Sequence, residues 1–242
     1  MRTPLSLTVA TTAGPVRDRN EDAVGLDGWQ LTPGDSGVLR MLLDPTVSHG
    51  IVLADGLGGH AGGAEASAVV VRMMSMPIGG PRVAEHLTTL AHRTHARLTD
   101  VGEAEPQLRG LGSTAGALAL EPDGQLTVLS IGDTLALHLI DGVLGSLNQP
   151  QRVGTALRQC LGGGAKNPPT PELRSLHAIP GARYLLCTDG VWEALPTDRL
   201  EQLASAATPE SACAAVLAEV ERRGGSDNAT IVVLDIPGGN RG

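Results

Sequence analysis

The sequence predicts an α+β fold whose sheets are built from antiparallel strands. The predicted elements come as strands, two helices, several strands, two helices and one strand, and do not alternate singly. The predicted strands in the middle of the chain are joined by short turns, of which Asp141-Gly142 is a strong hairpin signal. Hairpin connections favour antiparallel neighbours, so we expect antiparallel sheets.

The N-terminal part is predicted to contain four strands. Leu5–Thr11 alternates apolar and polar residues, as a half-buried strand does. Shorter apolar runs predict strands at Ala23–Leu26, Val38–Leu43 and Ile51–Ala54, whereas Trp29–Ser36 reads as a loop.

Two helices are predicted next. Glu65–Met76 has a wide apolar face. After Pro81, which suits a first helical position, apolar residues recur at helical spacing from Val83 to about Thr99. The polar segment Asp100–Gly112 is expected to connect this helix to the next strands.

The second half of the chain is mostly predicted strand. Its short apolar runs are Ser113–Leu120, Gln125–Ile131, Leu135–Ile140, Val143–Leu147, Leu173–Ile179, Arg183–Cys187 and Thr230–Leu234. Between them, Arg152–Leu161 has helical potential and is followed by Gly162-Gly163-Gly164. Thr197 and Thr208 are predicted N-caps of two late helices, and the second helix should end at Arg222-Arg223-Gly224.

Composition narrows the classes of function. The 242 residues predict one domain over 1–242, with its core at about 5–236. A net charge of −8 and the absence of Phe disfavour nucleic-acid binding. No stretch is apolar and long enough to span a membrane, and the N-terminus lacks the apolar core of a signal peptide. Three scattered cysteines predict reduced thiols and a cytoplasmic location.

Acidic residues beside glycine or at strand ends recur along the chain. These sites are Asn20-Glu21-Asp22, Asp55-Gly56, Gly132-Asp133, Thr188-Asp189-Gly190 and Asp227-Asn228. Each alone is best explained as a turn or a cap. Carboxylates that converge from separate strands, however, repel one another unless a cation lies between them. Oxygen ligands select Mg²⁺ or Mn²⁺, and no His or Cys pair has the spacing of a zinc site.

An ordered series of motifs, covering the chain from about Thr8 to Leu234, resembles the metal-dependent type 2C protein serine/threonine phosphatases of the bacterial branch. The motifs are Arg17-x-x-Asn20-Glu21-Asp22, Ala54-Asp55-Gly56-Leu57-Gly58-Gly59-His60, Gly112-Ser113-Thr114, Gly132-Asp133, Cys187-Thr188-Asp189-Gly190-Val191-Trp192-Glu193 and Asp227-Asn228-Ala229-Thr230. The resemblance implies a four-layer α-β-β-α sandwich, with two central antiparallel sheets flanked by helix pairs.

The same resemblance implies two bound ions, Mn²⁺ or Mg²⁺. Asp55 would bridge both ions. Glu21 and the Gly56 carbonyl would bind one of them, and Asp189 and Asp227 would bind the other.

Other residues take secondary roles in this scheme. Asp22 would lie behind the ligands or bind through water, and Arg17 would grip the substrate phosphate, a task that suits its planar fork. Asp133 and Glu193 match positions that contribute to a third, weaker ion in some members of the family, the latter usually as Asp.

The implied activity is hydrolysis of phosphoserine and phosphothreonine in proteins by a metal-activated water, with Arg17, Asp55 and Asp189 as the catalytic set. Its partners would be phosphorylated proteins and a cognate bacterial serine/threonine kinase. One alternative is a pseudophosphatase that binds phosphoproteins without turnover. Another is a different metallohydrolase such as a nuclease, which the acidic balance disfavours.

The chain departs from the family pattern in three places. Leu57 stands where eukaryotic relatives carry a histidine proposed as general acid, and His60 is either a supporting group or an ordinary loop histidine. Thr134-Leu135 replaces a common Ser-Arg pair, which should remove an ion pair. The short, glycine- and proline-rich segment before Cys187 predicts a reduced flap and a more open site.

Several other residues invite a chemical role but are better explained structurally. His86, His92 and His95 do not share one helix face, which favours surface or packing roles. Ser113-Thr114 lacks a His-Asp relay and is expected to start a strand. Trp192 is expected to pack under the metal loop, and Gly162-Gly163-Gly164 to act as a flap hinge.

Overall fold

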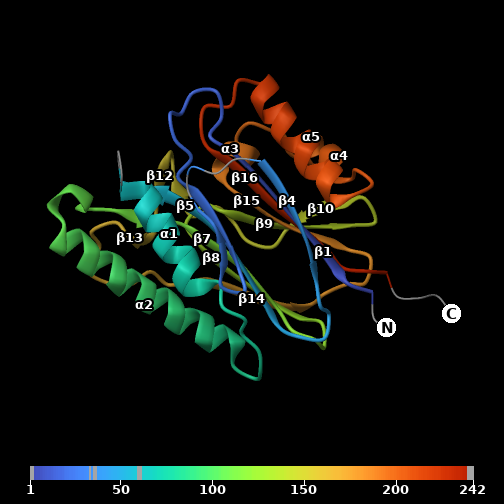
Figure 1. Cartoon of the computed structure of the whole chain (residues 1–242), viewed down its shortest axis with the longest axis horizontal. Helices are drawn as coiled ribbons and strands as arrows, with labels where there is room; N and C mark the ends of the chain where they lie inside the picture. Colours follow the sequence, from blue (N-terminus) through green and yellow to red (C-terminus); the bar gives the residue numbers. More distant parts are fainter. Residues whose placement is uncertain (1–2, 33, 35–36, 59–61, 239–242) are drawn as a thin grey trace.

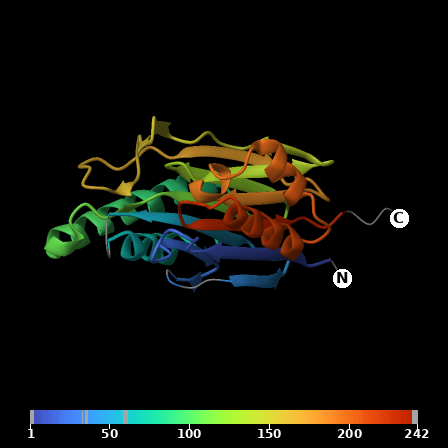
Figure 2. The same cartoon turned by 90° about the horizontal axis from the view of Figure 1, so that it is seen from above.

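Two antiparallel sheets packed face to face form the centre of the molecule, and helices cover both outer faces (Figure 2). The structure is a computed structural model that describes residues 3–32, 34, 37–58 and 62–238. The α+β prediction and the antiparallel pairing are both confirmed.

The first sheet has six strands in the order β10-β9-β15-β16-β1-β4. Their bounds are Leu5–Thr12 for β1, Gly37–Leu43 for β4, Leu135–Ile140 for β9, Val143–Ser146 for β10, Arg183–Cys187 for β15 and Ala229–Asp235 for β16. Asp141 and Gly142 both have positive φ, 51° and 80°, as the two-residue turn between β9 and β10 requires. This hairpin was predicted from the Asp-Gly pair.

The second sheet follows the path β13-β6-β5-β7-β8-β14, with β2 paired to β5 and β3 paired to β2. The bounds are Asp22–Leu26 for β2, Trp29–Leu31 for β3, His49–Leu57 for β5, Gly112–Ser113 for β6, Ala115–Leu120 for β7, Gln125–Ile131 for β8, Leu161–Gly162 for β13 and Glu172–His177 for β14. The strand β3 corrects the predicted loop at Trp29–Ser36. Its signal was the preceding Asp27-Gly28, which also has positive φ at both residues, 49° and 84°.

Helices α1 (Gly62–Met74) and α2 (Val83–Ala104) pack on the second sheet, and α4 (Thr197–Ala204) and α5 (Pro209–Arg222) lie over the first (Figure 1). Two short helices, α3 (Asp189–Trp192) and η1 (Pro106–Leu108), complete the set. Buried apolar residues form three clusters: under α1 and α2, between the sheets, and under α4 and α5. Three cores separate four layers, as predicted. Across the described ranges, no helix is both long and apolar enough to cross a membrane.

Two local predictions were wrong. Arg152–Leu161 is not helical; it forms a hairpin of β11 (Arg152–Val153) and β12 (Ala156–Leu157), followed by β13 paired with β6. Gly154, with φ of 61°, makes the turn, and pairing with a distant strand overrides the local helical composition. Every residue between β10 and β14 is described, and the segment contains only short strands and turns, with no helix.

The other wrong prediction concerns a helix start. Thr197 is already inside α4, and Pro196 occupies the N-cap position. Thr208, in contrast, caps α5 as predicted. Its side chain and that of Ser211, in the first turn of the helix, form a reciprocal capping box.

Candidate metal centre

One end of the sandwich collects the acidic residues because four strands begin or end there. Asp22 starts β2 and lies directly opposite Asp55 near the end of β5. Asp189 follows β15, and Asp227 precedes β16. A cleft of about 570 Å³ opens at this end, and Asp55, Asp189 and Asp227 all line it. The sheet pairing therefore brings together carboxylates from four distant parts of the sequence.

Asp55 is fixed through its backbone by the start of the neighbouring strand. The Asp55 N–H donates to Thr114 Oγ1 at 3.0 Å, and the Thr114 N–H donates to the Asp55 carbonyl at 2.9 Å. Ser113 Oγ donates to the same carbonyl at 2.9 Å. Ser113 and Thr114 thus have the strand-start role that was predicted for them, and their hydroxyls hold the main chain of Asp55 in place.

Asp22 lies beneath Asp55 in a buried, hydroxyl-lined pocket. Its side chain is 2% exposed, and its Oδ2 accepts hydrogen bonds from Thr188 at 3.0 Å and Thr230 at 2.6 Å. Burial raises the pKa of Asp22 to about 7, although the two threonine bonds oppose the shift. Its Oδ1 is buried and has no hydrogen-bond partner among the described residues.

Glu21 and Gly56 converge at the start of α1. A Cβ placed on Gly63 would lie 2.1 Å from Glu21 Oε2 and 2.9 Å from the Gly56 carbonyl oxygen. Only a residue without a side chain leaves room for both oxygens there. The N-terminus of a helix also favours nearby negative charge. The carboxylate and the carbonyl that were predicted to share an ion therefore approach the same point.

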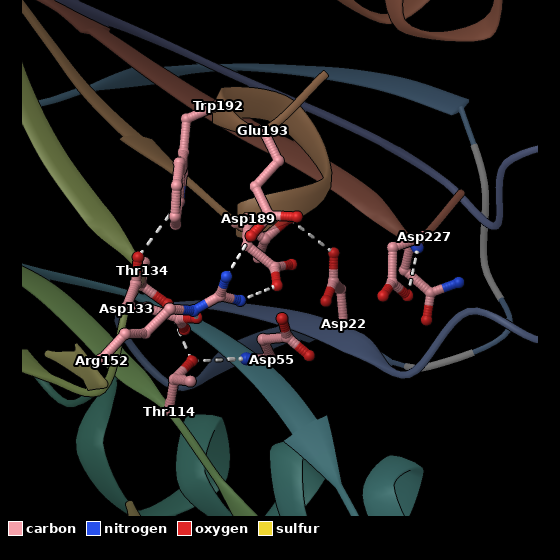
Figure 3. Close-up of polar contacts among 12 residues, drawn as sticks. Asp22, Asp55, Thr114, Asp133, Thr134, Arg152, Asp189, Trp192, Glu193 and Asp227 are labelled. Carbon is pink, nitrogen blue, oxygen red and sulfur yellow. Dashed lines mark hydrogen bonds and ion pairs between the residues drawn. The ribbon is translucent and has the colours of Figure 1, made fainter. Parts of the chain in front are cut away.

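Asp189 is held on one side by an arginine that the sequence did not single out. Arg152, at the start of β11, makes ion pairs with Asp189, Asp133 and Glu193 (Figure 3). Burial, together with the charges of Asp133 and other nearby acids, raises the pKa of Asp189 to about 6, with Arg152 opposing the shift. The second oxygen of Asp189, Oδ1, is buried, and no partner for it occurs in the described part of the chain.

The indole ring of Trp192 packs against the guanidinium of Arg152. The Arg152 guanidinium carbon lies 5.1 Å from the centroid of the Trp192 ring, within the range of a cation–π contact. Trp192 Nε1 donates to the Asp133 carbonyl at 3.1 Å. Trp192 thus packs against the Gly132-Asp133 loop, whereas the sequence predicts that it packs under the metal loop that begins at Asp55.

Arg17 stands at the mouth of the cleft. Its guanidinium donates to Asp227 Oδ2 at 2.6 Å, and 54% of its side chain is exposed. The pair raises the pKa of Arg17, chiefly through the hydrogen bond to Asp227. Asp227 and Asp189 are therefore each paired with a guanidinium, that of Arg17 and that of Arg152.

The donor set fits a hard divalent cation. Every candidate ligand is an oxygen atom, and two of the carboxylates carry a buried oxygen that has no partner among the residues described. Burial and the neighbouring acids, Asp22 first among them, hold the pKa of Asp55 well above its usual range, so an added cation would favour its ionised form. Within the described residues no three Asp, Glu, His or Cys side chains are already arranged around one point. Arg17 and Arg152 bind Asp227 and Asp189 instead.

The remaining predicted residues have simple placements. Leu57 lines the cleft and contributes no titratable group. His60 lies outside the described residues. His95 is buried and its Nδ1 accepts the Gly162 N–H at 3.1 Å, a packing contact that ties α2 to the base of the flap. His86 and His92 are on the surface.

Comparison with known proteins adds independent evidence. A family model described as Stage II sporulation protein E (SpoIIE) matches residues 47–237. The chain is 30% identical over 233 residues to serine/threonine protein phosphatase PstP of Mycobacterium tuberculosis, which covers 84% of this chain and 44% of that protein. It is 26% identical over 215 residues to serine/threonine phosphatase stp of Listeria monocytogenes, covering 76% of this chain and 83% of that one. The chain thus spans less than half the length of PstP.

Solved structures agree with these matches. The crystal structure of the Mycobacterium tuberculosis phosphatase PstP/Ppp superposes with a TM-score of 0.78 at 25% identity, over 97% of this chain and 99% of that chain. The catalytic domain of PstP in complex with two manganese ions superposes with a TM-score of 0.76 at 26% identity, over 98% and 100% of the two chains. A Streptococcus agalactiae serine/threonine phosphatase shares the fold at 17% identity, with a TM-score of 0.80.

Proposed function

We infer the function from one premise: the chain belongs to the SpoIIE/PP2C-type family of serine/threonine protein phosphatases. We propose that it hydrolyses phosphoserine and phosphothreonine in proteins and depends on two Mn²⁺ or Mg²⁺ ions. The observation that carries the proposal is the set of unsatisfied oxygens at one end of the sandwich. Asp22 Oδ1 and Asp189 Oδ1 lack partners in the described structure. Glu21 and Gly56 converge at the start of α1 and line the same cleft as Asp189.

The proposal assigns roles to these residues as follows. Glu21 and the Gly56 carbonyl would hold one ion, Asp189 and Asp227 the other, and Asp55 both. Asp22, which Thr188 and Thr230 bind, would support the cluster from below. The ions, once bound, would supply Lewis-acid activation of water and neutralise charge on the phosphoryl oxygens.

The charge of the cleft supports metal dependence. A phosphate monoester is an anion, and five acids of the described residues line the cleft: Asp18, Glu21, Asp55, Asp189 and Asp227. Like charges at close range repel strongly in a partly buried site. Arg17 and Arg19, the arginines lining the cleft, do not offset these five acids. Binding of substrate therefore requires additional positive charge, which two divalent cations would provide.

The proposal extends to partners and location. Phosphorylated proteins are the substrates that the family relationship supports, and a cognate serine/threonine kinase would supply them. We place the reaction in the cytoplasm, because Cys160, Cys187 and Cys213 are all free thiols. The binding-module alternative has no structural observation of its own in its favour.

The direct test is hydrolysis of p-nitrophenyl phosphate and of a phosphothreonine peptide by the purified chain. We expect turnover of both substrates in Mn²⁺, complete loss after chelation with EDTA, and recovery when excess Mn²⁺ is returned. Calorimetric titration with Mn²⁺ should be run on the same preparation. Metal binding without turnover of either substrate would contradict the proposal and favour a phosphoprotein-binding module.

Substitution of Arg17 tests how substrate is held. Arg17→Ala should raise KM for the phosphopeptide by about tenfold or more with a smaller change in kcat, because a guanidinium at the cleft mouth contacts phosphate and not the attacking water. Arg19→Ala is the matched control, since Arg19 is exposed and lines the same cleft. A large fall in kcat at unchanged KM would instead mean that Arg17 acts chiefly in the transition state.

A further inference from the structure

The contacts of Arg152 form a site of their own within the acidic end of the molecule. Its three nitrogens each bind a different carboxylate: Nε binds Asp133, Nη2 binds Asp189 and Nη1 binds Glu193. The arginine side chain is only 16% exposed, and Asp133 is 3% exposed. In Figure 3 the guanidinium reaches into the cluster from the side opposite Asp227.

The flap hairpin places this arginine through main-chain contacts. Gln151, the residue before it, donates its N–H to the Gly132 carbonyl at 2.9 Å. The Gln151 side-chain oxygen accepts the Gly132 N–H at 2.8 Å, so the two segments are joined twice. The Arg158 N–H then closes the hairpin on the Gln151 carbonyl at 2.8 Å. These hydrogen bonds therefore hold the main chain of Arg152 close to Asp133 and keep its guanidinium beside the acidic residues.

Asp189 can serve Arg152 and a metal ion at the same time. Arg152 binds Oδ2 of Asp189, whereas Oδ1 is buried and unpartnered in the described structure. A carboxylate presents separate lone pairs on its two oxygens and can bind two partners. The ion shared with Asp55 and Asp227 in the proposed function can therefore use Oδ1 without displacing the arginine.

A guanidinium and a metal ion cannot both occupy the space between Asp133, Asp189 and Glu193. Two cations at van der Waals distance repel, and the three carboxylate oxygens facing this space are already bound by Arg152. The Trp192 ring contributes a further attraction, since an aromatic face favours a planar guanidinium. The three carboxylates and the Trp192 ring that surround this space thus favour a guanidinium.

We propose that Arg152 is the resident third cation of this site: its guanidinium fills the space between Asp133, Asp189 and Glu193, limits the protein to two bound ions, and holds the flap hairpin against the cluster. The inference rests on the proposed two-ion function. It assigns Arg152 as a positioning residue, because its contacts are to carboxylates and to Trp192 and not to substrate.

Ion stoichiometry tests the proposal. Mn²⁺ bound per chain should be measured by calorimetric titration and by electron paramagnetic resonance of the free ion. We expect two ions in the wild-type chain and three in Arg152→Ala, the third weaker than the other two. Arg152→Lys keeps a positive charge and should remain at two, and Arg158→Ala, an exposed arginine on the same hairpin, should also remain at two.

The possible outcomes separate this inference from the proposed function. Three ions in the wild-type chain, or two in Arg152→Ala up to saturating Mn²⁺, would overturn the role of Arg152 and leave the phosphatase proposal standing. No bound ion in the wild-type chain would overturn the two-ion proposal and this inference with it.

A second measurement does not depend on metal. In a Trp29→Phe background Trp192 is the sole tryptophan, so its emission reports on the guanidinium stacked over it. Arg152→Ala should shift the emission to longer wavelength and increase proteolysis between residues 152 and 158, and Arg158→Ala should change neither. Unchanged emission and unchanged proteolysis in Arg152→Ala would contradict the positioning role.

Discussion

Replacing Asp189 by asparagine should abolish turnover, with kcat reduced by about a thousandfold or more, the scale on which loss of a catalytic side chain is measured. The amide keeps the shape of the carboxylate but loses its charge and one acceptor. It would therefore bind a divalent ion weakly through the Oδ1 position, which is unpartnered in the described residues. The initial rate should be measured over a Mn²⁺ range wide enough to reach saturation in each variant.

Asp55→Asn should have the same effect, because Asp55 is the residue assigned to both ions. Asp123→Asn is a suitable control, since Asp123 is exposed and lies at the turn between β7 and β8, away from the cleft. If either Asp55→Asn or Asp189→Asn kept the wild-type rate at saturating Mn²⁺, the assignment of the metal centre would be wrong.

The metal-free Asp189→Asn protein should nevertheless be folded and at least as stable as the wild type. Because the fold raises the pKa of Asp189 to about 6, ionisation of this carboxyl lowers the free energy of unfolding. The loss begins as the pH rises past the ordinary pKa of 3.8 and is complete above about 6. The neutral amide removes this cost at pH 8. Urea unfolding of both proteins in EDTA at pH 8 separates lost catalysis from lost structure.

The fold and most of the acidic cluster could be predicted because their signals are local. Asp55 follows an apolar run, Asp141-Gly142 carries the turn chemistry of a hairpin, and Thr208 precedes a proline at a helix start. Each of these residues is explained by its immediate neighbours in the sequence. The order of the elements then fixes which strand ends meet.

Arg152 could not be predicted, because all of its partners are remote. Asp133, Asp189 and Glu193 lie 19, 37 and 41 residues away, and nothing in the adjacent sequence distinguishes this arginine from Arg158. The local composition even favoured a helix. The actual strand β13 depends on hydrogen bonds to β6, a partner that a local pattern does not reveal.

Gly63 shows the same limit at a smaller scale. In the sequence it is one of several glycines before an alanine-rich helix, and the first turn of a helix tolerates alanine at least as well. Its requirement comes from Glu21 and Gly56, which only the folded chain brings to within 3 Å of its missing Cβ. The reason for the residue lies in the site and not in the helix.

Gly63→Ala should therefore weaken Mn²⁺ binding by about tenfold to a hundredfold, the range found when the groups that support metal ligands are disturbed. The new methyl carbon would stand 2.1 Å from Glu21 Oε2 and 2.9 Å from the Gly56 carbonyl oxygen, so both must move. The Mn²⁺ dissociation constant measured by calorimetry and the Mn²⁺ concentration for half-maximal turnover should rise together.

Gly62→Ala is the matched control, one residue earlier in the same helical turn. Among the described residues its Cβ would meet Leu111, at 3.4 Å from the Leu111 Cβ, which is ordinary van der Waals contact. Alanine is the better helix former by about 0.5–1 kcal/mol, so this variant should bind Mn²⁺ normally and unfold at equal or higher urea concentration. Equal Mn²⁺ affinities in the two variants would contradict the assignment of Glu21 and Gly56 as ligands of the ion, because a methyl group that displaces both oxygens would then have no effect on binding.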